Sequence, residues 1–131
     1  MPVTYEIDAA RKLVRTRCVG PVRMMDVLDH FRTLEADPAC PPHADVFLDL
    51  VELQSLPKSF QLAGVVYEVE QLQPKVRFGA CAIVVDREVL FGMMRIFATL
   101  AEGTFRVVRV FRKREEAEQW LQGEQSASTA R

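Results

Sequence analysis

Cysteine, histidine and glycine are scarce in this sequence, and their spacing excludes several kinds of chemistry. The 131 residues include three cysteines and two histidines. No Cys-x-x-Cys pair occurs, so neither a zinc ribbon nor a thioredoxin-like redox site is indicated. The six glycines are scattered singly, and the Gly-x-Ser-x-Gly motif of many hydrolases does not occur. We therefore predict a protein that is not an enzyme and that binds neither a cofactor nor a metal.

The segment Cys40–His43, with Asp37 and Asp45 nearby, is the one place where residue types suited to a metal or thiol site gather. A zinc site needs three or four converging ligands, and only His30 is left outside this loop to help. The whole loop over residues 37–43 contains three prolines, which fix the backbone and remove hydrogen-bond donors. A stiff surface loop is the better interpretation.

The net charge and the distribution of apolar residues are typical of an ordinary globular protein. The net charge is −1, which gives no global attraction to nucleic acid or to an anionic membrane. The longest uninterrupted apolar run, Ala80–Val85, is far too short to span a membrane. Residues 1–6 lack the basic start and apolar core of a signal peptide, so we expect a cytoplasmic protein.

Hydrophobic periodicity predicts an α/β fold with the element order ββαβαβαβα. Apolar residues alternate at Val3, Tyr5 and Ile7, and a second strand over residues 12–19 would complete an antiparallel hairpin. Helical spacing occurs over 22–35, 57–73, 86–102 and 113–121, and the segments 45–50, 76–85 and 104–111 are typical of strands. A single mixed sheet of about five strands with flanking helices would bury these faces, with 76–85 near its centre.

Two local features predict where the later elements begin and end. Asp86 suits the N-cap position of the helix over 86–102. Residues 123–131 are small and polar, which predicts a disordered C-terminal tail. We expect residues 1–122 to form one domain.

The element order and a set of distributed residues resemble the SpoIIAA-like branch of the STAS family, the small domains of anti-sigma-factor antagonists and sulphate transporters. The resemblance spans residues 3 to about 121. The matching stretches are Ala36–Pro38, Val46–Leu50, Ala82–Val84, Phe91–Phe97, Val110–Arg112 and Glu116–Leu121. It implies a SpoIIAA-like fold and a regulatory domain that works by binding another protein.

The resemblance also implies a phosphorylation site. Antagonists of this family carry an Asp-Ser-Ser-Gly-type sequence after the third strand, and a partner kinase phosphorylates its serine. Ser59 falls at about that place, although Pro57 replaces the aspartate and Phe60 the glycine. Phosphate at Ser59 would suit the first turn of a helix. The alternative is that Ser55 or Ser59 only caps the helix.

The segment 88–102 is more apolar than a one-sided surface helix requires, because its apolar side chains cover roughly 200° of the circumference. We expect Val89, Met93, Ile96, Phe97 and Leu100 to face the sheet. A neighbouring helix, a second copy of the chain or an apolar ligand could cover the remainder. We predict a homodimer with the following residues at or beside the contact: Phe91, Met94, Arg95 and Ala98.

These patterns favour a non-catalytic regulatory or protein-interaction domain that binds a protein partner and itself. The alternative is a carrier of an apolar ligand or lipid. A carrier needs a cavity of a few hundred cubic ångströms, which a core of this size can hardly spare.

Overall fold

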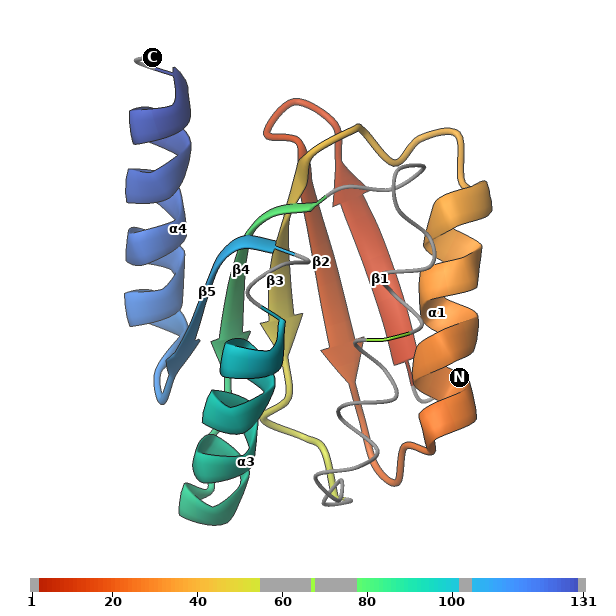
Figure 1. Ribbon diagram of the computed structural model, residues 1–131, viewed down its shortest axis with the longest axis vertical. Coiled ribbons are helices and arrows are strands. Elements are labelled where there is room, and N and C mark those ends of the chain that lie inside the picture. The colour runs from red at the N-terminus through yellow and green to blue at the C-terminus, as the bar shows by residue number, and fades with distance from the viewer. Residues whose placement is uncertain (1–2, 55–66, 68–77, 102–104, 130–131) are drawn as a thin grey trace.

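The computed structural model describes residues 3–54, 67, 78–101 and 105–129. Figure 1 shows the strands together in one sheet with helices around it. The strands are β1 (Val3–Asp8), β2 (Leu13–Cys18), β3 (Ala44–Asp49), β4 (Phe78–Val84) and β5 (Phe105–Phe111). The helices are α1 (Met24–Ala36), α3 (Glu88–Leu100) and α4 (Arg114–Thr129). The helix predicted over 57–73 lies outside the described residues, apart from Tyr67.

The five strands lie in the order β1-β2-β3-β4-β5. β1 and β2 pair antiparallel, as the alternation in the first twenty residues predicts, and all later pairs are parallel. All seven residues of β4 are buried, because this strand has a strand on each side and packing on both faces. The predicted single mixed sheet with β4 in its interior is therefore confirmed.

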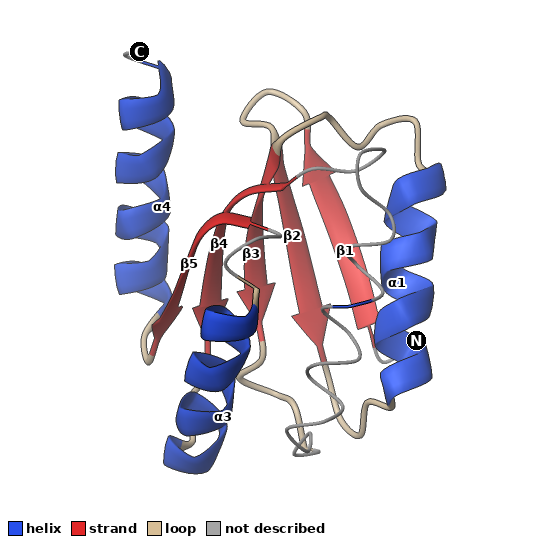
Figure 2. Ribbon diagram, viewed as in Figure 1, coloured by secondary structure: helices blue, strands red, loops and turns tan. Residues whose placement is uncertain are grey.

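The two faces of the sheet carry separate cores, because successive side chains of a strand point to opposite faces. On one face, Val14 of β2 belongs to the same cluster as Leu34 of α1 and Leu90 of α3. On the other face, Leu13 packs in a cluster with Ala117 and Leu121 of α4. Figure 2 shows α4 set apart from α1 and α3. Each face is thus closed by its own set of helices.

A close approach between β3 and β4 requires glycine at position 79. The Asp45 carboxylate accepts a hydrogen bond from the backbone N–H of Ala80 at 2.7 Å. A Cβ at residue 79 would overlap this carboxylate and would lie 3.0 Å from the carbonyl oxygen of His43. Gly79 therefore lets the amino end of β3 reach the backbone of β4.

The start of α3 differs from the prediction. Arg87 occupies the N-cap position, and no side chain caps the helix there. Asp86 lies one residue too early to take that position. The prediction of an Asp86 cap was wrong by one residue, an ordinary uncertainty for a helix end.

The end of the chain also differs from the prediction. α4 continues to Thr129, so residues 123–129 are helical and the expected disordered tail is wrong over that range. Distant partners hold the added turns in place. The Gln125 side chain donates to the backbone oxygen of Arg11 at 2.8 Å and accepts from its guanidinium at 3.1 Å. Glu124 accepts a hydrogen bond from Arg106 at 3.2 Å.

Candidate functional site

The carboxyl edge of the parallel strands is where open α/β sheets usually place their sites, and here it is built around the loop that follows β3. Leu50 donates its backbone N–H to the carbonyl oxygen of Val84, at the end of β4, at 2.9 Å. Gly20 and residues 52–54 exchange two backbone hydrogen bonds, from Gly20 to the Glu52 oxygen and from Gln54 to the Gly20 oxygen, each at 3.0 Å. The positive φ of 72° at Gly20 suits glycine. The loop is therefore held from both sides by the ends of neighbouring strands.

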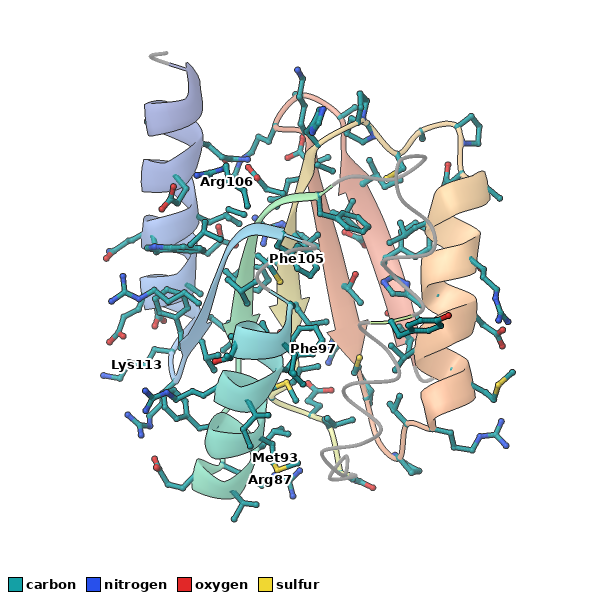
Figure 3. All side chains as sticks on the ribbon, viewed as in Figure 1. Arg87, Met93, Phe97, Phe105, Arg106 and Lys113 are labelled. Carbon is teal, nitrogen blue, oxygen red and sulfur yellow. The ribbon has the colours of Figure 1, made fainter. Side chains whose placement is uncertain are left out.

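Side chains from three other elements fix the same loop. Arg87, labelled at the start of α3 in Figure 3, donates to the carbonyl oxygen of Leu53 at 2.8 Å. Two ion pairs flank it: Arg17 with Glu52, and Arg114 with Asp49 at 2.9 Å. All of these cations are exposed, so each pair contributes little alone, and together they hold the loop in one geometry.

This loop leads toward the predicted phosphorylation site. Ser59 and the alternative cap Ser55 both lie outside the described residues. The phosphorylation of Ser59 therefore stays a prediction.

The structure turns α3 differently from the sequence-based expectation. Leu90, Met94 and Phe97 are its buried residues, and Figure 3 shows Phe97 on the side nearest the sheet. Met94 is only 5% exposed and belongs to the core, so its predicted place at a contact between chains is wrong. The reason is that Leu90, Met94, Phe97 and Ala101 form one continuous stripe that packs against the sheet.

The other three predicted contact residues have mixed surroundings. Arg95 is exposed, and Ala98 is partly buried. The Phe91 ring is partly buried beneath the Arg112 guanidinium, whose central carbon lies 4.0 Å from the ring centroid. Arg112 also makes two hydrogen bonds to Glu88, at 2.8 and 3.0 Å. The side of α3 around Phe91 is therefore already covered by a side chain of its own chain.

A different side of α3 is apolar and exposed. Val89 is 63% exposed, Ile96 44% and Leu100 41%, and Met93 lies between them in sequence with partial exposure. We call these four residues the α3 flank. All were predicted to face the sheet, and that prediction was wrong for Val89, Ile96 and Leu100. Their spacing of four, three and four residues puts them on one line of the helix.

The proline loop after α1 does not hold an activated thiol. The Tyr5 hydroxyl donates to the Asp37 carboxylate at 2.7 Å, and this bond raises the pKa of Tyr5 to about 12 and lowers the pKa of Asp37. Burial raises the pKa of the partly buried Cys40 thiol, which keeps it protonated. Among the described residues, no group of three or more His, Cys, Asp or Glu side chains could hold a metal ion.

A polar pair inside the apolar layer was not predicted from the sequence. The ring nitrogen Nε2 of His30 lies 3.1 Å from the hydroxyl of Thr16, which is 2% exposed. The Tyr5 ring packs against the imidazole, with ring centroids 5.4 Å apart. Burial lowers the pKa of His30 to about 4, so the imidazole is neutral near pH 7. The one sign of this polar pair in the sequence was the presence of a histidine within the predicted amphipathic helix 22–35.

The structure resembles the crystal structure of an uncharacterized protein of the DUF3478 family, from Shewanella loihica PV-4, which is described as having a SpoIIAA-like fold. The TM-score is 0.60, the alignment covers 91% of this chain and 93% of that chain, and 19% of residues are identical. This chain has a SpoIIAA-like fold. The resemblance noted in the sequence is thereby confirmed at the level of fold.

The SpoIIAA-like fold alone assigns neither partner nor ligand, because one fold can serve many functions. No family model matches this sequence, and no match is found among curated proteins. Within the described part of the chain, no helix has both the length and the apolar character needed to cross a membrane.

Proposed function

We propose that this chain is a non-catalytic regulatory domain of the STAS-like type that works by binding protein, and that the α3 flank is its surface for binding a second copy. The observation that carries this proposal is the exposure of Val89, Ile96 and Leu100 on a helix whose adjacent stripe is buried. A contiguous exposed apolar patch on a domain of this size commonly marks a protein contact.

The shape of the α3 flank suits helix–helix pairing. Val89 to Leu100 spans about 16 Å of helix, roughly three turns. Gly92 lies beside this line, and the space where its side chain would be is open. A helix with a glycine at that place can approach another helix closely.

A second copy is the partner that the charges favour. The charged residues of α3 itself are one exposed cation, Arg95, and one exposed anion, Glu88, rather than residues of one sign. The net charge of −1 produces little repulsion between copies. A two-fold axis would place the same apolar line against itself, the common arrangement of homodimers.

The absence of an activated thiol among the described residues supports a non-catalytic role. Burial is the main cause that raises the pKa of each thiol, at Cys18, Cys40 and Cys81. Each is therefore a protonated thiol near pH 7, which is a poor nucleophile.

Native mass spectrometry of the purified protein tests the proposal against the carrier alternative. The proposal predicts ions at twice the mass of the chain, with no retained small molecule. Ions at the mass of one chain plus a lipid would favour a carrier instead. Ions at the mass of one chain alone, from a high micromolar solution, would contradict self-association.

A further inference from the structure

β1 is an edge strand of the sheet, and its outer hydrogen-bonding side faces away from β2. It lies at one end of the sheet and pairs only with β2, in a regular register from Val3 opposite Cys18 to Asp8 opposite Leu13. Among the described residues, none hydrogen-bonds to the backbone of β1 on the side away from β2. The strand contains no proline, lysine or bulge, three of the features that commonly prevent edge pairing.

The opposite edge of the sheet is better protected. β5 has exposed arginines at positions 106 and 109, and both α3 and α4 contact it. β1 is contacted by α1, which lies alongside it at the end of the sheet (Figure 1). Among the described elements, one helix contacts β1 and two contact β5, so the edge of β1 is the less covered of the two.

An open groove of about 560 Å³ lies between β1 and α1. Its lining residues are Tyr5, Asp29, Arg32, Thr33, Ala36 and Asp37. The α1 residues, from 29 to 36, extend for about 10 Å along the helix, a length that an extended chain covers in about three residues. A strand added beside β1 would therefore direct alternate side chains into this groove.

The charges of the groove favour a cationic occupant. Asp29 and Asp37 are carboxylates, and the single cation Arg32 lies 3.6 Å from Asp29, so one negative charge remains in excess. Pairing of β1 with the β1 of a second copy would bring two such acidic grooves together, which like-charge repulsion disfavours.

We infer that the free edge of β1 binds an extended, basic segment of another protein as a sixth strand. The backbone of that segment pairs with the outer backbone groups of β1, and its alternate side chains enter the groove beside Asp29 and Asp37. This mode gives affinity through main-chain hydrogen bonds and specificity through the groove. The site lies on α1 and β1, away from the α3 flank, and does not depend on self-association.

A fluorescein-labelled peptide of alternating lysine and valine is a suitable probe. Fluorescence anisotropy measures its binding, and hydrogen exchange measures the protection of amides over residues 3–8. We expect binding with slower exchange over this strand. The same peptide methylated on alternate backbone nitrogens should not bind, because it cannot pair as a strand. A glutamate–valine peptide should bind at least about threefold more weakly.

Asp29→Lys should weaken binding of the lysine peptide by about threefold or more, since the exposed carboxylate becomes a cation. Glu116→Lys, the same charge change at an exposed position on α4, should leave binding unchanged. Equal binding of the methylated peptide, or unchanged exchange over residues 3–8, would overturn strand addition. Protection of β1 that rises with protein concentration alone would show that a second copy occupies the edge.

Discussion

Because His30 is partly buried and its pKa is lowered in the folded state, we expect the stability of the protein to depend on pH in a defined window. The unfolded chain titrates this imidazole near 6.5, whereas burial lowers its pKa to about 4 in the folded state. The folded state therefore disfavours the protonated form, and stability is lost as the pH falls from about 6.5 to about 4. At about 1.4 kcal/mol per pH unit, the difference is worth about 3 kcal/mol, a large part of a typical domain's stability.

Urea unfolding followed by circular dichroism, between about pH 7.5 and about pH 4.5, measures this loss. In His30→Phe the free energy of unfolding should be lower near neutral pH, because the Thr16 hydroxyl loses its hydrogen-bond partner. The free energy of unfolding of this variant should also change less with pH across the window. His43→Asn is the matched control, since His43 is exposed and its positive φ of 58° is one that asparagine tolerates. That control should keep the slope of the wild type. An equal slope in His30→Phe would refute the assignment to His30.

Two further predictions concern glycine and the end of α4. Gly79→Ala should lower the free energy of unfolding by about 1–3 kcal/mol, because its Cβ would displace the Asp45 carboxylate. In the monomer, Gly92→Ala should raise the free energy of unfolding by about 0.5–1 kcal/mol, since its site within the single chain is open and helical. Equal effects of the two glycine substitutions in urea titrations would contradict the close approach of β3 and β4. Gln125→Ala should lower stability by about 1 kcal/mol and Gln122→Ala, exposed on the same helix, by almost nothing. Fast hydrogen exchange over residues 123–129 in the wild type would show that these turns are not anchored.

Most of the fold could be predicted because its signals are local. The alternation at Val3, Tyr5 and Ile7 predicts a first strand with one polar face, and the structure has that pattern. The continuous apolar run Ala80–Val85 predicts an interior strand, and every residue of it is buried. Each of these signals depends only on neighbours in sequence.

The rotation of α3 could not be predicted in this way. Its apolar residues cover more of the circumference than the sheet can bury, so periodicity alone does not say which part faces inward. Packing in three dimensions makes that choice, and it buries Leu90, Met94 and Phe97. The helical end of α4 was missed for a related reason, because the partners of Glu124 and Gln125 are Arg106 and Arg11, one of them more than a hundred residues away.

Two substitutions on α3 that the sequence alone would treat alike should have different effects on folding. Met94→Glu places a charge in the core and should prevent stable folding. Ile96→Glu places the same charge on the exposed α3 flank and should leave the monomer folded, as judged by circular dichroism. Thr99→Glu is the matched control, since Thr99 is exposed on the same helix but off the apolar line.

Sedimentation velocity at high micromolar concentration tests the central claim, that the α3 flank binds a second copy, most directly. We expect a dimer for the wild type and for Thr99→Glu, and a folded monomer for Ile96→Glu. A monomeric wild type, or a dimer that survives Ile96→Glu, would contradict the claim. Unfolding of Ile96→Glu would contradict it as well, because it would show that the chain itself covers this flank.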